Sequence, residues 1–528
     1  YGPHRRNSRG VEFGCREAVR ALASEIEAAG KKPAEAVSII DGTRQKGETR
    51  QCLSPNDGRS VVGTVIEAAE GQIAGLVESA VKAARAGFRA WDATPVEIRA
   101  KALERFADLM EERRARLLAL LQSEAGKTID DALAELREAV DFCRYYAMEA
   151  RRHYGPLQDL PGPTGESNRF GMRGRGVFVA ISPWNFPLAI FTGQIVAALV
   201  SGNSVIAKPA EQTPLAAAET VALMHEAGIP ASALHVLMGD GRLGAQLVAH
   251  PRIDGVVFTG STEVARAINQ TLAQKQGPIT PLIAETGGIN AMIVDATALP
   301  EQVADDVVMS AFRSAGQRCS ALRLLFVQED VADRMIAMIA GAARALRLGD
   351  PRDFAVHVGP VIDAEAKQRL EAHVALMKRE AKAVHFAGTA PTEGSYVAPH
   401  MFELARAEDL TEEVFGPILH VVRYRAADLD KVLDTIEAKG YGLTLGLHTR
   451  IEATVEKVVK RLAIGNVYAN RNMIGAVVGV QPFGGNGLSG TGPKAGGPHY
   501  LPRFGLEQTV SINTAAAGGN AALIAMEE

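Results

Sequence analysis

A regular alternation of strand-like and helix-like runs between residues 177 and 294 constrains the fold most strongly. The strand-like runs are short and apolar, at 177–181, 204–207, 234–238, 255–258 and 292–294. The runs between them have the length and the apolar spacing of helices. A strand–helix–strand rhythm of this kind predicts a parallel sheet with helices on its faces. A second alternating block at about 304–470 predicts a second α/β unit.

The segments outside these blocks differ in character. Residues 1–50 are polar and helical in pattern, which predicts an arm rather than a core. Apolar positions recur at threes and fours between 66 and 152, which is typical of helices. Residues 153–170 are rich in Gly and Pro and indicate an excursion or boundary, and the tail ends in a strand-like run at 508–514.

Charge and cysteine content exclude several classes of protein. The net charge of −4 gives no electrostatic case for nucleic acid or an anionic membrane. The four cysteines are sparse and form no CxxC pair, so we expect no disulfide framework, no metal site and a reducing, cytoplasmic location. The most apolar stretch, 177–200, is interrupted by Pro183, Asn185 and Pro187, which argues against a membrane span.

Three strings could bind a nucleotide. Gly239, Gly241 and Gly244 form a GxGxxG after a strand, but such matches are common in a chain with 52 glycines. The turn at 258–261 is a better candidate, because a glycine before a helix N-terminus lets the backbone approach a pyrophosphate. The string 207–211 ends another strand with a lysine and a glutamate that could bind ribose hydroxyls. From pattern alone, an ordinary turn and a surface ion pair remain open as alternatives.

Three other residues have the chemistry of acyl transfer. Cys319 lies among Gly, Gln, Arg and Ser in a polar loop, where the neighbouring Arg318 could lower the thiol pKa. Glu285 leaves an apolar strand into a Gly-Gly turn, where partial burial would raise its pKa into the range of a general base. Asn185 lies between two prolines, and a rigid amide can stabilise an oxyanion. An inert buried cysteine, a solvated loop Glu and an unremarkable turn are the alternatives.

Taken together, these strings resemble the aldehyde dehydrogenase superfamily over about residues 53–514. The resemblance is carried, in the family's order, by PWNFP (183–187), KPAEQTP (208–214), FTGSTEVA (258–265), ETGG (285–288), GQRC (316–319), EVFGP (413–417) and PFGG (482–485). It implies a Rossmann-like NAD-binding domain, an α/β catalytic domain and a small β-flap used for oligomerisation. On this basis we expect an N-terminal arm at 1–50, the NAD-binding domain at 51–152 and 175–286, the catalytic domain at 287–479, and the flap with its tail at 153–174 and 500–528.

The resemblance also implies roles for individual residues. Cys319 would attack an aldehyde, Asn185 and the Cys319 N–H would hold the oxyanion, and Glu285 would activate water to release the acid. The retained Glu285 favours water over coenzyme A as the acyl acceptor. The cofactor would be NAD, with Gly239–Gly244 as a decoy. The expected cofactor-binding residues are Ser182, Pro183, Trp184, Lys208, Glu211, Gly260, Ser261, Glu413 and Phe415.

A narrower resemblance points to the glutamate-γ-semialdehyde (1-pyrroline-5-carboxylate) dehydrogenase module of the bacterial proline utilization A family. Its carriers are YGPHRRNSRG (1–10), GAVVGVQPF (475–483), GLSGTGPKAGGPHYL (487–501), VSINTAAAGGN (510–520) and Ser320 after the nucleophile. It implies oxidation of glutamate semialdehyde to glutamate. The expected substrate-binding residues are Phe186, Arg318, Ser320, Gly475, Ala476 and Phe483.

In that family a flavin-dependent proline dehydrogenase precedes the module, so we expect the chain, which opens with Tyr1, to be part of something longer. We also expect a homodimer. Two alternatives remain: a general NAD-dependent semialdehyde dehydrogenase, for example for succinate semialdehyde, and a non-catalytic scaffold of the same fold. The presence of Cys319, Glu285 and Asn185 together argues against the scaffold.

Overall fold

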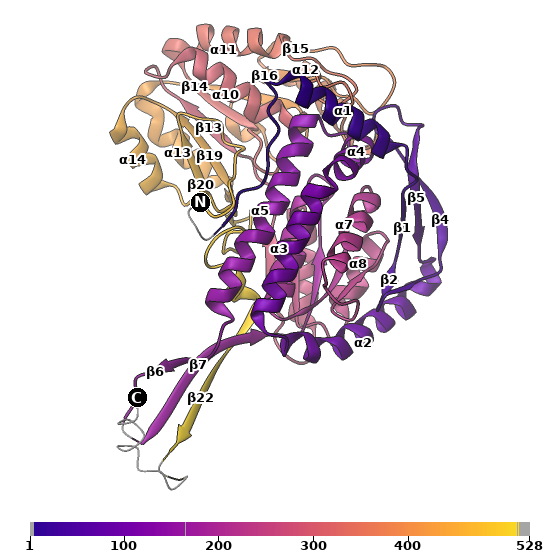
Figure 1. Cartoon of the computed structure of the whole chain (residues 1–528). Coiled ribbons are helices and arrows are strands. Elements are labelled where there is room, and N and C mark those ends of the chain that lie inside the picture. Colours follow the sequence, from indigo (N-terminus) through magenta and orange to yellow (C-terminus); the bar gives the residue numbers. More distant parts are fainter. Residues whose placement is uncertain (1–4, 164, 515, 517–528) are drawn as a thin grey trace.

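Two α/β units lie against each other, and a long β-sheet arm projects from one of them (Figure 1). The structure is a computed structural model that describes residues 5–163, 165–514 and 516. The remaining residues of the expected arm and tail, 1–4, 515 and 517–528, lie outside the described residues. The predicted α/β architecture with two largely parallel sheets is confirmed.

The first sheet has the strand order β12-β11-β8-β9-β10-β2-β3. Its strands are β2 (Ile39–Ile40), β3 (Thr43–Arg44), β8 (Val177–Ile181), β9 (Ser204–Lys208), β10 (Leu234–Val236), β11 (Gly255–Thr259) and β12 (Leu282–Glu285). The strands from β12 to β10 are parallel, as the alternation predicts. They are buried on both faces, which explains their almost continuous apolar sequences.

Helices cover both faces of this sheet. They are α2 (Ile73–Asp92), α3 (Val96–Glu112), α4 (Arg114–Glu124), α5 (Ile129–His153), α6 (Ala189–Val200), α7 (Pro214–Glu226), α8 (Gly241–Ala249) and α9 (Thr262–Gln274). Successive residues of a strand point to opposite faces. Accordingly, Phe178 and Ala180 of β8 enter the core shared with α3, α5, α6 and α7, while Val177 and Val179 enter the core shared with α2, α8 and α9.

The direction of chain progression reverses beside β8, because β9 lies on one side of it and β11 on the other. In an open parallel sheet, the loops that leave the carboxyl ends of two such strands diverge and open a crevice. Residues that follow β8 and β11 are therefore the ones expected to meet a ligand.

The N-terminal region contains more than the expected helical arm. After α1 (Arg16–Gly30), β1 (Glu35–Val37) forms a small sheet with β5 (Val61–Glu67) and β4 (Glu48–Leu53), and β2 pairs antiparallel with β10 through Ile39 and Val236. The strands β1 and β2 are too short to leave a recognisable alternation in the sequence, and they form by pairing with strands that are distant in the chain. Residues 35–44 thus extend the first unit.

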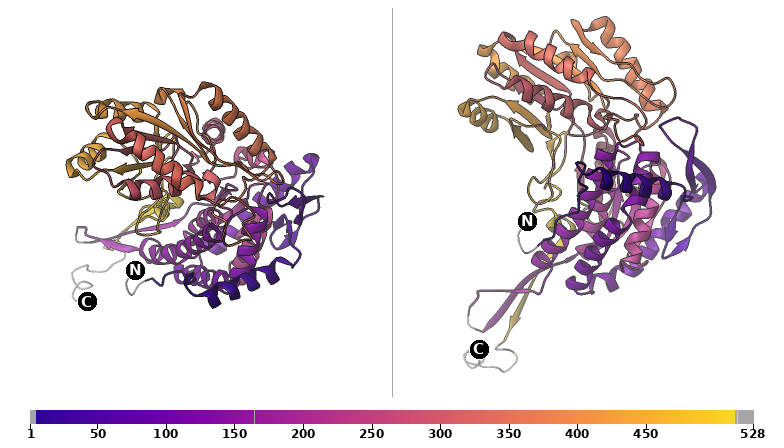
Figure 2. Two further views of the ribbon diagram at one scale, coloured as in Figure 1. Left: turned by 90° about the horizontal axis from the view of Figure 1, so that it is seen from above. Right: turned by 45° about the horizontal axis from the view of Figure 1, so that its top comes forward.

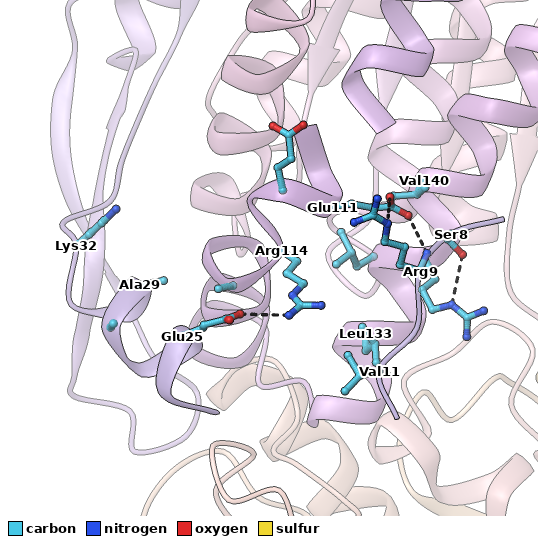
Figure 3. Close-up of a pocket in the computed structure, with 15 residues that line it drawn as sticks. Ser8, Arg9, Val11, Glu25, Ala29, Lys32, Glu111, Arg114, Leu133 and Val140 are labelled. Atoms are coloured by element: carbon cyan, nitrogen blue, oxygen red, sulfur yellow. Dashed lines mark hydrogen bonds and ion pairs between the residues drawn. The ribbon is translucent and has the colours of Figure 1, made fainter. Parts of the chain in front are cut away.

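The residues before α1 lie along helix α5. Together with α1 and α5 they line a surface cavity of about 570 Å³ (Figure 3). Two pairs of its charged groups contact each other: Arg114 with Glu25 at 3.3 Å and Arg9 with Glu111 at 3.5 Å. None of the predicted site residues lines this cavity.

The second sheet has the order β15-β16-β17-β14-β13-β19-β20. Its strands are β13 (Ala291–Val294), β14 (Leu324–Gln328), β15 (Ala383–Ala387), β16 (His400–Glu403), β17 (Ile418–Tyr424), β19 (Thr444–His448) and β20 (Asn466–Ala469). Only β15 is antiparallel to its neighbour. Again the faces alternate, since Ala291 and Ile293 enter one core while Met292 and Val294 enter the other.

Helices also flank the second sheet. They are α10 (Pro300–Phe312), α11 (Glu329–Arg344), α12 (Ala364–Glu380), α13 (Leu429–Ala438) and α14 (Glu452–Arg461). The minor elements are η1 (Glu70–Gln72), η2 (Arg313–Gly316), η3 (Ala407–Asp409), η4 (Ala426–Asp428), η5 (Leu501–Phe504) and the strand pair β18 (Tyr441–Gly442) and β21 (Asn486–Gly487). No helix in the described part of the chain is long and apolar enough to cross a membrane.

The projecting arm is a sheet of β6 (Gln158–Leu160), β7 (Glu166–Gly174) and β22 (Gly505–Asn513). It extends away from both units in each view (Figures 1 and 2). The long strands β7 and β22 pair in register from Gly174 with Gly505 to Glu166 with Asn513. Segments 340 residues apart in the chain thus build the arm where the flap was expected.

Candidate active site

A cavity of about 450 Å³ lies between the two units and receives loops from both. Its lining includes these sequence-predicted residues: Phe186, Glu285, Arg318, Cys319, Ser320, Gly475, Ala476 and Phe483. They come from positions up to 297 residues apart, and only the fold brings them together. The thiol, the carboxylate and every predicted substrate residue therefore share one space.

The first sheet positions its candidates at the carboxyl ends of its strands. Ser182 follows β8, Lys208 ends β9, Gly260 follows β11 and Glu285 ends β12. Because these strands are parallel, their carboxyl ends lie at one edge. This is the crevice edge that the strand order predicts.

Glu285 is held at one oxygen and unpaired at the other. The Gly485 N–H donates to Oε2 at 2.9 Å, while Oε1 is buried and has no hydrogen-bond partner within the described structure. Burial raises the pKa of this carboxyl to about 8, against the lowering effects of the Gly485 bond and of Lys494. A carboxyl with this pKa and an unpaired oxygen beside the cavity can take a proton near neutral pH.

The loop that carries Cys319 is unusual in its backbone. Ser314, Ala315 and Gly316 have φ values of 55°, 52° and 68°, in the left-handed region. A Cβ on Gly316 would lie 2.1 Å from the Gly416 carbonyl oxygen, so only glycine fits there.

Buried polar side chains hold this loop from behind. The Asn290 amide donates to the carbonyls of Cys319 at 2.5 Å and Ala321 at 3.0 Å. The buried Arg323 guanidinium donates to the carbonyls of Gly316 at 2.7 Å and Arg318 at 2.9 Å. These bonds fix the thiol where no regular strand or helix does.

The electrostatics of the Cys319 thiol differ from the sequence interpretation. Burial, with smaller contributions from Glu413 and Glu285, raises its pKa to about 12, and Arg318 lowers it too little to offset them. Arg318 donates to Asp131 at 2.8 Å and to Ser314 at 2.9 Å, so its charge is largely compensated by a buried carboxylate. The neighbouring arginine alone therefore does not generate the thiolate.

Asn185 lies against the Cys319 loop but does not line the cavity that contains Cys319. Its side-chain amide donates to the Gln317 carbonyl at 3.1 Å. An amide has two N–H bonds, so one is left after this contact. The contact ties the Asn185 side chain to the loop of the thiol.

The end of the crevice beside β9 has a buried cation. Lys208 Nζ donates to the Pro209 carbonyl at 3.0 Å and lies 3.6 Å from the Glu211 carboxylate. Burial lowers the Lys208 pKa and Glu211 opposes that shift. A lysine beside a half-exposed carboxylate matches the donors and acceptors of ribose hydroxyls.

The two glycine-containing turns differ in what they offer an anion. Ser261 caps α9 by accepting from Val264 N–H at 3.3 Å, and with Gly260 it lies at the strand switch. The N-terminus of α8 is capped instead by the Asp240 carboxylate, which accepts a hydrogen bond from the Arg242 N–H at 2.9 Å. A carboxylate at that N-terminus repels phosphate, which favours the 260–261 turn and the decoy interpretation of Gly239–Gly244.

Aromatic and charged groups gather at the other end of the crevice. Trp184 and Phe415 meet edge to face with ring centroids 5.6 Å apart. Glu413 lies 3.3 Å from the Arg323 guanidinium, and burial raises the pKa of this carboxyl against that pairing. An acceptor and flat apolar rings fit a ribose and its attached ring. The donor set therefore suits a dinucleotide along its whole length.

Several buried charged residues of α5 escaped the sequence interpretation. Asp131, Glu135 and Glu138 recur at spacings of four and three, so they share one helical face. Glu135 accepts from the N–H groups of Leu188 and Ala189, at the start of α6, and so supports the turn that carries Asn185. Glu138 lines the cavity, and burial raises its pKa to about 7. Charged residues on an otherwise apolar helix face were the signal that could have revealed them.

The loop after β20 forms another part of the cavity lining. Gly475 and Ala476 line it, and the Tyr468 hydroxyl donates to the Gly475 carbonyl at 2.7 Å. A Cβ on Gly475 would lie 2.8 Å from an Arg471 Nη atom, the end of a flexible side chain. Among the described residues, no group of three or more His, Cys, Asp and Glu is placed to hold a metal ion.

Comparison with known proteins gives a consistent result. The family model described as "Aldehyde dehydrogenase family" matches residues 43–510. The chain is 50% identical to the "Bifunctional protein PutA" of Rhizobium meliloti, over 96% of the chain but 40% of that protein. It is 38% identical to the "1-pyrroline-5-carboxylate dehydrogenase" of Geobacillus thermodenitrificans, over 94% of the chain and 96% of that protein.

A solved structure agrees with these relatives. Proline utilization A of Bradyrhizobium japonicum has a TM-score of 0.89 and 65% sequence identity, and the match covers 98% of this chain and 49% of that one. The chain thus spans less than half the length of the bifunctional proteins that it matches.

Proposed function

The chain belongs to the aldehyde dehydrogenase family, and from this premise we propose that it oxidises L-glutamate γ-semialdehyde to L-glutamate with NAD⁺ as the hydride acceptor. One observation carries the proposal: a partly buried thiol, a carboxyl with an unpaired oxygen and a small-residue loop line a single cavity. The thiol and the carboxyl supply the chemistry of aldehyde oxidation. The loop and the names of the relatives supply the substrate.

The proposed reaction starts at Cys319. Its proton passes to Glu285, whose raised pKa suits it as acceptor, and Sγ bonds to the aldehyde carbon. The free Asn185 N–H and the Cys319 backbone N–H stabilise the oxyanion. When bound, NAD⁺ would supply the acceptor for the hydride that leaves that carbon. The product on Cys319 is a thioester.

Water then completes the reaction. Glu285 takes a proton from water, the water oxygen bonds to the acyl carbon, and the C–S bond breaks to release the acid. The balance is aldehyde, NAD⁺ and water giving carboxylate, NADH and two protons. Glu285 thus acts in both halves, and it must lose its proton before each use.

The substrate assignment rests on the end of the cavity remote from Cys319. Glutamate semialdehyde carries an α-carboxylate and an α-ammonium there. Gly475 and Ala476 allow backbone N–H groups to approach the carboxylate, and Ser320 adds a hydroxyl. Phe186 and Phe483 line the same cavity and suit the methylene chain. Buried donors left unpaired by the wrong substrate give strong discrimination.

The preference for NAD⁺ over NADP⁺ is proposed from Glu211. Members of this family use NAD(P). The Glu211 carboxylate lies beside Lys208 where the adenosine ribose is proposed to bind, and it would repel a 2′-phosphate.

Separate observations support proposals on the parent protein, the oligomeric state and the location. The bifunctional relatives extend far beyond the matched region, so we propose an upstream flavin-dependent proline dehydrogenase domain in the parent protein. The β6-β7-β22 arm is proposed to pair two copies, since an isolated sheet of this kind gains stability by packing. Cys15, Cys52, Cys143 and Cys319 are all free thiols, which suits a cytoplasmic protein.

The deciding experiment compares the rates of oxidation of different aldehydes, followed by the absorbance of NADH. Glutamate semialdehyde should have a far higher kcat/KM than succinate semialdehyde or propanal. Ser320→Ala should raise KM for glutamate semialdehyde and leave that for propanal nearly unchanged. A higher kcat/KM for propanal in the unmodified protein would refute the substrate, and no NADH with any aldehyde would leave only the scaffold.

A further inference from the structure

Glu285 and Lys494 flank the same glycine turn. The Gly485 N–H donates to Glu285 Oε2 at 2.9 Å. A Cβ on Gly484 would lie 2.8 Å from Glu285 Oε1 and 3.1 Å from Lys494 Cα. The turn at 484–485 therefore separates the carboxylate from the lysine by little more than one backbone layer.

The Lys494 ammonium is anchored by neutral acceptors. It donates to the Gly465 carbonyl in a short contact and to Asn466 Oδ1 at 3.2 Å. Asn466 in turn bonds to the Pro482 carbonyl at 3.0 Å, just before the turn. Within the described residues, no carboxylate lies within 4 Å of this ammonium. Its charge is thus fixed in place but not neutralised by direct contact.

The two groups act on each other through the turn. Burial raises the pKa of Glu285, and Lys494 is the charged group that lowers it. Burial likewise lowers the pKa of Lys494, and Glu285 raises it. Cys319 and Tyr500 also face Glu285, but burial raises the pKa of each, so both are neutral near pH 7.

We propose that Lys494 is a positioning residue for the general base: its ammonium, anchored on Gly465 and Asn466, holds a positive charge behind the Gly484–Gly485 turn and stabilises the carboxylate form of Glu285. The inference deepens the proposed function and rests on the role of Glu285 in it. It names a residue that acts through Glu285 and does not touch the substrate.

The separation of the two groups suits this role. A direct ion pair would hold a carboxylate so strongly that it became a weak base. An ammonium across one turn favours the ionised form while it leaves Oε1 free to accept a proton from water. Lys494 is also partly exposed to solvent. The ammonium that favours the return of Glu285 to its carboxylate form after each turnover therefore lies near solvent.

The test compares Lys494→Met with Lys494→Arg and with a matched control. Lys439 is similar in kind, because its ammonium donates to the carbonyls of Ala407 and Leu410 and it does not line the cavity. Enzyme and NAD⁺ are mixed with glutamate semialdehyde, or with propanal, in single turnovers from pH 6 to 10. NADH reports hydride transfer, and mass spectrometry of quenched samples reports decay of the Cys319 thioester.

In Lys494→Met, the midpoint of thioester decay should move up by about one pH unit, and decay at neutral pH should slow about tenfold. The yield of NADH per site should be retained, Lys494→Arg should restore most of the rate, and Lys439→Met should follow the wild type.

A Lys494→Met profile that superimposes on that of the wild type would overturn the proposal. Equal slowing of both phases without a shift would do the same, because it indicates a structural role. If Lys494→Met does not fold, Lys494→Gln takes its place in the comparison. A wild type that forms no thioester would instead refute the proposed function itself.

Discussion

The two α/β units carry their proposed catalytic and cofactor-binding residues at opposite ends of their strands. In the first unit Ser182, Lys208 and Glu285 lie at or just beyond the carboxyl ends of β8, β9 and β12. In the second, Cys319 and Glu413 precede β14 and β17. Parallel topology alone collects the first set. The second set depends on buried side chains that hold loops, notably Asn290 and Arg323.

The two units should therefore respond differently to substitution. A substitution on the first sheet should remove the function of that residue and leave its neighbours in place. A substitution of a buried side chain behind the Cys319 loop should displace the loop and, with it, Cys319. Substitutions in the two units should therefore differ in how far their effects spread.

The largest effect should come from Cys319→Ala. Loss of the nucleophile should lower NADH formation roughly a thousandfold or more. Cofactor binding, followed by quenching of Trp184 fluorescence, should persist because the proposed adenosine residues belong to the first sheet. Loss of both properties together would contradict the independence of the two units.

Glu285→Gln should slow thioester hydrolysis by roughly 10²–10⁴-fold. In the wild type, the hydrolysis rate should rise with pH through about 8, the pKa to which burial raises this carboxyl, and in the variant that rise should disappear. Rapid-quench measurements of the acyl-enzyme would check both.

The same variant has a predicted stability signature. A carboxyl whose pKa is higher in the folded state makes stability fall as pH rises from about 4.5 to about 8. The Tm of Glu285→Gln should therefore be higher than that of the wild type. The difference between the two Tm values should grow as pH rises from about 4.5 to about 8 and stay constant at higher pH. Equal Tm values at pH 8 would contradict the burial of an ionisable group here.

Asn290→Ala should reduce turnover on the order of 100-fold although Asn290 touches no proposed reacting atom. Two carbonyls of the Cys319 loop lose their donor, and a displacement of about 1 Å is enough for such a loss. Unfolding free energy should fall by about 1–3 kcal/mol for the carbonyls left unsatisfied. Denaturant titration and the rate of thiol alkylation would report the two effects, and unchanged alkylation would show that other contacts suffice.

The smallest effect should be that of Glu211→Gln. Removing the carboxylate should raise kcat/KM for NADP⁺ by about tenfold, roughly the value of one unfavourable charge contact of 1.4 kcal/mol. The rate with NAD⁺ should change little, because Lys208 remains. Unchanged discrimination would place the 2′ position away from Glu211.

The sequence by itself predicted the two parallel sheets, because strands buried on both faces require continuous apolar runs and their helices require a different period. It also predicted several of the cavity residues, such as Cys319, Glu285 and Gly475, since these occur in strings that resemble a known family. It did not reveal β2 at the sheet edge or Glu138 and Lys494 beside the site, because no local pattern marks a residue whose role depends on distant neighbours.

Only the tertiary structure decided the electrostatics of the site. Adjacency in sequence suggested that Arg318 activates Cys319, yet Asp131, 187 residues earlier, compensates that arginine. Burial and two carboxylates from other segments then raise the pKa of the thiol. Charge interactions depend on distance and on exclusion of water, and both are properties of the folded chain that residue order does not contain.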